Sequence, residues 1–170
     1  KSKKTRPGDA TRSAPLTIFE PLLSRKDCKF FSLQVTSKTQ FTNKSDHFAP
    51  LPHQENNHLI DLAPYLYDFE QTAGALSAVD VLISTDTATP NLAGALGVPV
   101  WLLMPDDLID WRWKMDKPVD YVYETMWYGS MTVIRQRKKH VWDNVIKTIS
   151  SYLDHINRPV TQDFSINKTL

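Results

Sequence analysis

One stretch of the sequence decides the fold: Val79-Asp80-Val81-Leu82-Ile83-Ser84-Thr85-Asp86-Thr87-Ala88-Thr89-Pro90-Asn91-Leu92-Ala93-Gly94-Ala95-Leu96-Gly97-Val98-Pro99. Its opening is β-branched and nearly continuous in apolar character, as expected of a strand covered on both faces. Small polar residues then take over, and the spacing of Leu92, Ala93 and Leu96 predicts the buried stripe of a short helix. Gly97 stands where a left-handed C-terminal residue is favoured, with Pro99 just beyond. The stretch therefore predicts a buried strand that runs directly into a helix.

The turn between this strand and this helix is a candidate anion-binding site. Asp86 or Thr87 is placed to cap the helix, and Thr85, Thr87 and Thr89 bring hydroxyl groups beside its first-turn amides. Ligands of an open parallel sheet bind beyond the carboxyl ends of its strands, so these groups are expected to face a phosphate or a sugar. The spacing alone leaves open the alternative that these side chains only cap the helix.

Helices and strands alternate along the chain. Strands are predicted at 29–34, 58–62, 79–84, 98–103 and 132–135, with helices at 17–23, from 68 onward and at 141–156. This order predicts an α/β fold, a Rossmann-like open parallel sheet with helices on both faces. Because no strand precedes the first helix, we expect the sheet to lack its first strand. Residues 1–157 are predicted to form one domain and residues 158–170 a polar tail.

Two helix starts have capping-box sequences. Thr17 is followed by Glu20, with Leu16 placed as a hydrophobic staple, and Asp68 is followed by Gln71. The helix after Asp68 is predicted to bury Phe69, Ala73, Leu76 and Ala78. The final helix has the clearest periodicity, with a predicted apolar face of Val141, Trp142, Val145, Ile146, Ile149, Tyr152, Leu153 and Ile156.

Composition limits the classes of partner. The chain has 170 residues, 41% of them hydrophobic, and a formal charge of +1, which gives no reason to expect nucleic acid as a partner. A single cysteine excludes an internal disulfide and is consistent with a reducing, cytoplasmic location. The longest apolar stretch, Val98 to Met104, is far shorter than a transmembrane segment. His47, His53 and His58 lack a recognisable ligand spacing with nearby carboxylates, so no metal site is expected.

From Asp86 to Pro99 the sequence resembles the signature Asp-Thr-(Ala/Gly)-x-x-His-Leu-Ala-(Gly/Ala)-Ala-Leu-Gly-x-Pro of the heptosyltransferase-like glycosyltransferases, including the branch often fused to tetratricopeptide repeats. Asn91 departs from it, at the family's usual histidine. Five further stretches resemble family motifs in the same order: Arg12-Ser13-Ala14-Pro15-Leu16, Ser32-Leu33-Gln34, Asp61-Leu62-Ala63-Pro64 with Asp68-Phe69, Asp110-Trp111-Arg112-Trp113, and Trp127-Tyr128-Gly129-Ser130-Met131 with Arg135-Gln136. The resemblance covers most of the chain.

This resemblance implies the C-terminal, donor-binding half of a GT-B glycosyltransferase, whose two Rossmann-like domains face each other across a cleft. It implies an inverting transfer from a nucleotide-diphosphate sugar, without a metal or cofactor. The base that activates the acceptor lies in the other, N-terminal domain of such enzymes. No catalytic residue is therefore expected in this chain, and the chain alone is expected to be inactive.

The candidate substrate-binding residues follow from these arguments. The diphosphate is assigned to the turn formed by Asp86, Thr87, Ala88, Thr89 and Asn91, with Lys4, Arg6 and Arg12 of the first loop as positive charges. Gln34, at the carboxyl end of a strand, is a candidate contact for the nucleotide base. Arg112, between Trp111 and Trp113, is a candidate for the acceptor or the diphosphate, while packing is the favoured role of both tryptophans. The alternative function is a noncatalytic nucleotide- or partner-binding module derived from this fold.

Overall fold

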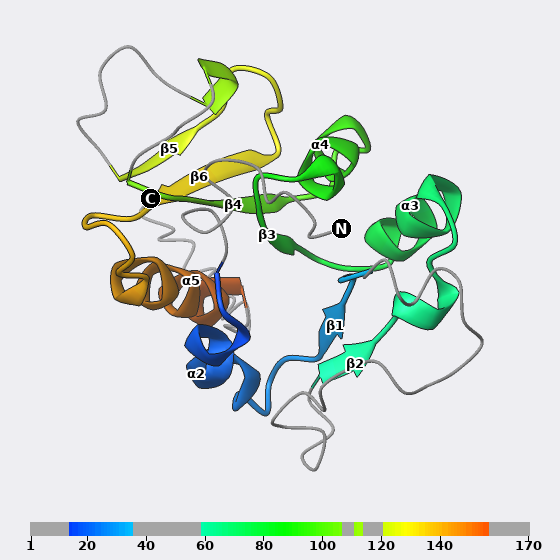
Figure 1. Ribbon diagram of the computed structural model, residues 1–170, viewed down its shortest axis with the longest axis horizontal. Helices are drawn as coiled ribbons and strands as arrows, with labels where there is room; N and C mark the ends of the chain where they lie inside the picture. Colours follow the sequence, from blue (N-terminus) through cyan, green and yellow to red (C-terminus); the bar gives the residue numbers. More distant parts are fainter. Residues whose placement is uncertain (1–13, 36–58, 107–110, 114–120, 157–170) are drawn as a thin grey trace, which may run out of the picture.

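The structure is a computed structural model that describes residues 14–35, 59–106, 111–113 and 121–156 (Figure 1). Its helices and strands, in chain order, are the 3-10 helix η1 (Leu16–Phe19), α2 (Glu20–Leu23), β1 (Phe30–Ser32), β2 (Leu59–Asp61), the 3-10 helix η3 (Ala63–Tyr65), α3 (Phe69–Ser77), β3 (Leu82–Thr85), α4 (Ala88–Ala95), β4 (Val100–Met104), the 3-10 helix η4 (Trp111–Trp113), β5 (Val122–Glu124), β6 (Met131–Arg135) and α5 (Asp143–Ile156). The predicted alternation of strands and helices is confirmed in the part of the chain that is described.

The described strands form two sheets. One has the order β3-β4-β6-β5, and the other is the pair β1-β2. All neighbours pair in parallel except β5 and β6, which are antiparallel. The arrangement is Rossmann-like α/β, as predicted. The prediction of a wholly parallel sheet is wrong, because β5 is antiparallel to β6. This three-residue edge strand was too short to be recognised in a segment without clear patterning.

β4 is the centre of the larger sheet. It lies between β3 and β6, and all five of its residues are buried. Its side chains alternate between two hydrophobic cores on opposite faces of the sheet. The α4-side core comprises Leu76, Leu82, Ala93, Val98, Val100, Leu102, Met104, Trp113, Met131 and Val133. The α5-side core comprises Leu22, Trp101, Leu103, Ile134, Trp142, Val145, Ile146, Ile149 and Leu153.

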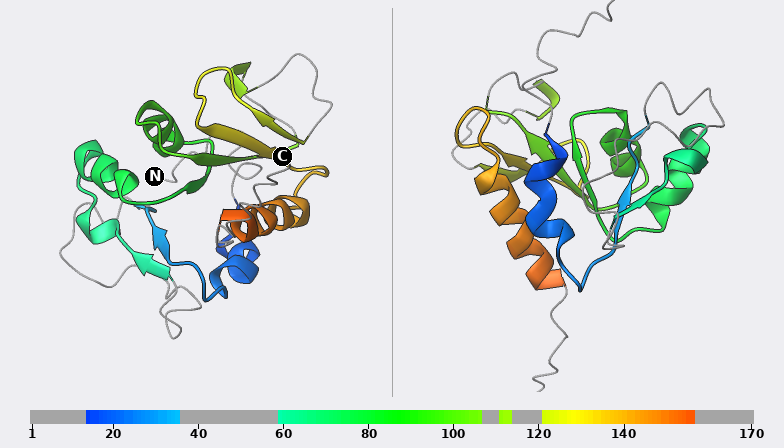
Figure 2. Two further views of the ribbon diagram at one scale, coloured as in Figure 1. Left: turned by 180° about the vertical axis from the view of Figure 1, so that it is seen from behind. Right: turned by 60° about the horizontal axis from the view of Figure 1, so that its bottom comes forward.

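Helices cover both faces of the sheet, as the two cores require. α3 and α4 contribute Leu76 and Ala93 to the α4-side core, whereas α2 and α5 contribute to the α5-side core. Figures 1 and 2 show α2 and α5 side by side on one face and α4 on the other. In the part of the chain that the structure describes, no helix has the length and apolar character needed to span a lipid bilayer.

Ion pairs of Arg25 join the end of α2 to the end of α5. Arg25, just past the end of α2, forms ion pairs of 2.6 Å with Asp27 and with Asp154, in the last turn of α5. These carboxylates, Asp27 first, raise the pKa of Arg25 above its ordinary value. The two helices therefore end side by side.

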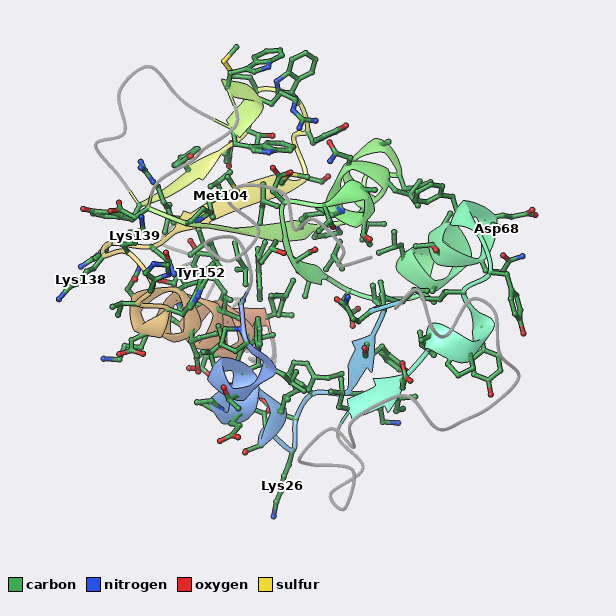
Figure 3. The ribbon with its side chains drawn as sticks, in the orientation of Figure 1. Lys26, Asp68, Met104, Lys138, Lys139 and Tyr152 are labelled. Carbon is green, nitrogen blue, oxygen red and sulfur yellow. The ribbon has the colours of Figure 1, made fainter. Side chains whose placement is uncertain are left out.

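The capping prediction is confirmed for α3 and wrong for the first helix. Asp68 accepts hydrogen bonds from the amides of Glu70 and Gln71, and the Gln71 side chain accepts one from the Asp68 amide. Figure 3 shows Asp68 at the outer start of its helix. Before α2, by contrast, the chain forms η1 and no side chain caps either helix. The proline in the first turn of α2 is the physical reason, because its ring favours a helix start there, beyond Thr17.

The apolar faces predicted for the helices are partly correct. Of the face predicted for the final helix, Val145, Ile146, Ile149 and Leu153 of α5 are buried, as is Trp142 just before it, but Val141 and Ile156 are exposed. Leu76 is buried in α3, whereas Phe69 is 63% exposed and Ala78 is exposed. In α4, Ala93 is buried and Leu96 is 46% exposed. The exposed residues all lie at or beyond a helix end, where the neighbouring elements no longer cover the helix.

Candidate functional site

The order of the strands reverses between β1 and β3. From β1 the chain moves outward to β2, and from β3 it moves the opposite way through β4 to β6. Figures 1 and 2 both place β1 between β2 and β3. Ligands of open α/β sheets bind beyond the carboxyl ends of the strands at such a reversal point. The turn at Asp86 follows β3, and Gln34 follows β1, so the fold places both candidates at this point of the sheet.

The amino end of α4 is the most polar part of this edge. Thr87 occupies the N-cap position in an extended conformation, but no side chain accepts a hydrogen bond from the first-turn amides. α3 differs, because Asp68 occupies the corresponding amides of its own helix. An amino end without a side-chain cap leaves backbone donors and the positive end of the helix dipole directed outward. α4 therefore has the geometry of an anion site, and α3 does not.

The sequence of the turn determines which groups it presents. Pro90 is the third residue of α4 and has no N–H, so the outward donors come from Thr87, Ala88 and Thr89. Thr87 and Ala88 are exposed, and Thr89 is half-buried. Asn91 donates a hydrogen bond of 2.8 Å from Nδ2 to the carbonyl oxygen of Thr87. This bond turns the Asn91 amide group back along its own helix.

Asp86 lies between the strand and the N-cap. It is half-buried, and no side-chain capping bond from it to α4 is present. The alternative in which Asp86 serves as the helix cap is therefore wrong. Thr87, rather than Asp86, is the N-cap residue, although its hydroxyl makes no capping bond either.

A second group of polar side chains lies at the carboxyl ends of β4 and β6. Arg135 donates from Nη2 to the carbonyl oxygen of Asp106 and lies 3.8 Å from its carboxylate. Gln136 is 1% exposed, and its Oε1 accepts a hydrogen bond of 3.4 Å from the Asp106 amide. Arg135 Nε and Gln136 Nε2 are buried donors without a hydrogen-bond partner. These residues were not among the predicted site residues, although their place at the end of the last strand was a usable signal.

Arg112 lies in a different environment from the turn at Asp86. Its guanidinium carbon is 5.5 Å from the ring centroid of Trp113. The ring centroids of Trp113 and Tyr128 are 6.5 Å apart. Tyr128 in turn packs against Gly94, seven residues along α4 from Thr87, which is about 10 Å of helix. These contacts associate Arg112 with the carboxyl-terminal half of α4 rather than with its amino end.

The two tryptophans of this segment differ in burial. Trp113 is 2% exposed, and its carbonyl oxygen accepts a hydrogen bond of 2.7 Å from the Tyr123 hydroxyl. Packing is therefore confirmed for Trp113. Trp111 is 72% exposed and makes an edge contact with Trp127, itself 58% exposed. The packing role is wrong for Trp111, because only one side of η4 faces the α4-side core.

Three of the positively charged residues assigned to the site are not tested by the structure. Lys4, Arg6 and Arg12 fall outside the described residues, as does the polar tail at 158–170. Figure 3 shows Lys138 and Lys139 at the end of the sheet remote from α4. Within residues 14–35, 59–106, 111–113 and 121–156, no group of three or more His, Cys, Asp or Glu side chains is arranged to hold a metal ion.

Comparisons with protein-family models, with curated proteins and with solved structures returned no match. The fold itself defines the class, a Rossmann-like α/β protein with a mostly parallel four-stranded sheet.

Proposed function

We propose that the chain is the donor-binding domain of a glycosyltransferase that takes a nucleotide-diphosphate sugar. The observation that carries this proposal is the amino end of α4, which has no side-chain cap and follows β3 at the reversal point of the sheet. The motifs that resemble heptosyltransferase-like enzymes support the same interpretation, because their strongest match covers this turn.

The chemistry of transfer explains why this turn suits the donor. When the bond between sugar and phosphate breaks, negative charge builds on the departing diphosphate and needs stabilisation. The amides of Thr87, Ala88 and Thr89 and the dipole of α4 supply it without a metal ion. Gln34, exposed beyond β1, is the proposed contact for the nucleotide base on the other side of the reversal point.

The acceptor and the base that activates it are assigned to a second domain, as the resemblance implies. The isolated chain is then expected to bind a donor and to transfer nothing. Incubation with a panel of nucleotide sugars and candidate acceptors, analysed by mass spectrometry, should give no glycosylated product. Reproducible turnover would show that the chain contains more than the donor half.

Binding is tested by titrating the labelled chain with uridine, adenosine and guanosine diphosphates in excess chelator. We expect the largest amide chemical-shift changes between Thr85 and Asn91. The amides of Glu70 and Gln71, which are occupied by Asp68, should not move. Shifts confined to Trp111–Trp113, or binding that requires magnesium, would contradict the proposal.

Two matched variants separate a specific site from a general effect on the fold. Thr87→Val removes the hydroxyl of the α4 N-cap and should weaken nucleotide binding several-fold. Thr72→Val is the control, because the Thr72 hydroxyl bonds the Asp68 carbonyl at 2.8 Å in the first turn of α3. Equal affinity of both variants and the parent chain would exclude a role for Thr87.

A specific observation favours the second candidate, a noncatalytic nucleotide- or partner-binding module. Asn91 stands at the family's histidine position and its amide group is bonded to its own helix, so it brings no charge to the turn. Asn91→His distinguishes a diphosphate site at this turn from a module that binds another partner. For a donor site, the imidazole should tighten diphosphate binding more at pH 6 than at pH 8, because it is protonated at the lower pH. A module specialised away from diphosphates should show no such pH-dependent gain.

A further inference from the structure

Two neighbouring side chains at the end of β6 hold buried hydrogen-bond donors that have no acceptor. Within the described residues, four buried side-chain groups lack a partner, and two of them are Arg135 Nε and Gln136 Nε2. Gln136 is also the one polar residue in this part of the chain that is almost wholly buried. Buried donors in native proteins are nearly always paired, because an unpaired donor has lost its water and gained nothing in return. These two nitrogens therefore indicate an acceptor that the described residues do not supply.

Both side chains extend from β6 over the end of the neighbouring strand, β4. Asp106 lies two residues past β4, and Arg135 Nη2 donates to its carbonyl oxygen. Gln136 Oε1 accepts a hydrogen bond of 3.4 Å from the amide of the same residue. Each unpaired nitrogen belongs to the same planar group as a bonded atom, so these contacts fix both nitrogens beside the Asp106 peptide. Arg135 and Asp106 are both partly exposed, which places the cluster just below the surface.

The backbone that carries these side chains is held by three elements. The Arg135 amide donates to the carbonyl oxygen of Tyr121, just before β5, at 2.7 Å. The Gln136 amide donates to the carbonyl oxygen of Met104, at the end of β4, at 2.9 Å. Asn144, in the first turn of α5, donates from Nδ2 to the Arg135 carbonyl oxygen at 2.9 Å. The donors are therefore preorganised, and a ligand that accepts from them orders little of the protein.

The charges around the cluster favour an anion. Arg135 is positive, but its acceptor is a neutral carbonyl, and the Asp106 carboxylate is 3.8 Å away, beyond hydrogen-bond range. Arg137 and Lys138, which follow in the chain, are exposed, and Figure 3 shows Lys138 at this end of the sheet. A guanidinium group bonds an anionic oxygen more strongly than a neutral one. A phosphate has several acceptor oxygens, so one phosphate in place of the Asp106 peptide can serve both side chains.

The cluster lies at the same edge and on the same face of the sheet as the turn before α4. β3, β4 and β6 are parallel, so their carboxyl ends meet at one edge, where open α/β sheets bind ligands. Alternate residues of β6 share a face, and Met131 and Val133 belong to the α4-side core, which places Arg135 on that side. The backbones of β3 and β6 are two strand spacings, about 10 Å, apart. The Arg135 side chain covers part of this distance, because it extends over the end of β4.

We propose that Arg135 and Gln136 form a phosphate-binding subsite at the carboxyl end of β6. The phosphate oxygens accept hydrogen bonds from Arg135 Nε and Gln136 Nε2, and the guanidinium group supplies the opposite charge. Access requires that the Asp106 peptide move aside, and its bond of 3.4 Å to Gln136 is too long to be strong. The phosphate is either a free anion or one phosphate of a nucleotide that is also held at the turn before α4. The subsite requires only the phosphate, so it is independent of the donor-binding function proposed above.

The test uses the full chain and observes the two side chains directly. Heteronuclear NMR follows the Arg135 Nε–H and Gln136 Nε2 signals while inorganic phosphate or uridine diphosphate is added in excess chelator. We expect both signals and the Asp106 amide to shift saturably. If uridine diphosphate moves the amides between Thr85 and Asn91 in the same transition, a nucleotide is the source of the phosphate. If those amides do not move, the subsite takes a free anion.

Two arginine variants separate a built site from general attraction by positive charge. Arg135→Lys keeps the charge but removes the Nε–H donor, so it should weaken phosphate binding about tenfold. Arg137→Gln is the control, because Arg137 is exposed and its guanidinium carbon lies 5.2 Å from the ring centroid of Tyr121. This variant removes a positive charge two residues away and should change the affinity less than about twofold. The amide spectrum of α5 confirms that both variants are folded.

Three results would overturn the proposal. The first is the absence of a saturable shift at Arg135 Nε and Gln136 Nε2 in millimolar phosphate. The second is a loss of affinity in Arg137→Gln as large as that in Arg135→Lys, which would mean that diffuse charge attracts the anion. The third is slow hydrogen exchange of the Arg135 Nε–H before phosphate is added, which would mean that another part of the chain already bonds it. None of these results bears on the donor site, whose signals are the amides between Thr85 and Asn91.

Discussion

β4 and β1 both pair in parallel with a neighbouring strand, yet they differ in burial. β4 has neighbours on both edges and a core on each face, and all of its residues are buried. Among the described strands β1 has one neighbour, and Phe31 in its middle is 40% exposed. Both strands are rich in large apolar residues. The difference shows that the number of neighbouring elements, rather than residue type, determines how deeply a strand is buried.

The largest expected loss of stability follows from a substitution in β4. Leu102→Ala in β4 should destabilise the chain by about 2–5 kcal/mol, because it leaves a cavity at a fully buried position. Ile60→Ala in β2 should cost about 1 kcal/mol or less, because Ile60 is 43% exposed. Urea denaturation of both variants measures the difference. Equal losses would mean that the β1-β2 pair is covered by something other than the described residues.

Alanine substitutions at two helical glycines should change the stability of the chain in opposite directions. A methyl group at Gly94 of α4 would lie 2.5 Å from Tyr128 Cγ, so Gly94→Ala should destabilise by about 1–3 kcal/mol. A methyl group at Gly74 of α3 would meet no atom within 4 Å, so Gly74→Ala should stabilise by about 0.4–1 kcal/mol. Thermal unfolding of the two variants measures whether each is more or less stable than the parent chain. A stabilising Gly94→Ala would show that Tyr128 does not pack on α4.

Removal of a helix cap has a smaller effect, confined to the periphery. Asp68→Ala should cost about 0.5–2 kcal/mol, because the amides of Glu70 and Gln71 lose their acceptor. Asp80→Ala, at an exposed position just before β3, is the matched control and should change the unfolding midpoint little. If the two variants lost the same stability, net charge rather than capping would be responsible.

The smallest effect concerns the link between η4 and β5. Tyr123→Phe removes the hydrogen bond to the Trp113 carbonyl and should cost about 0.5–1.5 kcal/mol at neutral pH. Burial raises the pKa of Tyr123 above its ordinary value of 10.0, so the folded state favours the neutral phenol. The stability from this group is complete below about pH 10 and declines as pH rises above it, because the unfolded chain loses the proton first.

Denaturation at pH 8 and pH 11 tests the direction of this pH dependence of stability. The parent chain should lose more stability than Tyr123→Phe between the two values. An identical loss in both would show that the Tyr123 hydroxyl is accessible to solvent in the folded state.

The sequence by itself determined the features that depend on neighbours within one turn of the chain. The capping box at Asp68, the left-handed Gly97 with its φ of 73°, the apolar run of β4 and the central stripe of α5 were all predicted and are present. Each arises from backbone geometry or from periodicity within a single element, so no distant residue is needed to define it. The α/β class follows from the order of those elements.

Tertiary structure alone decided which apolar residues are covered and which polar groups meet. Phe69, Leu96 and Trp111 have the character of core residues, but the described elements leave 46–72% of each exposed. Arg135 and Gln136 meet Asp106 because β4 and β6 are adjacent, although about 30 residues separate them in the chain. The split between β1 and β3 likewise depends on strand order. These features require contacts between distant segments, which local patterns of residues do not specify.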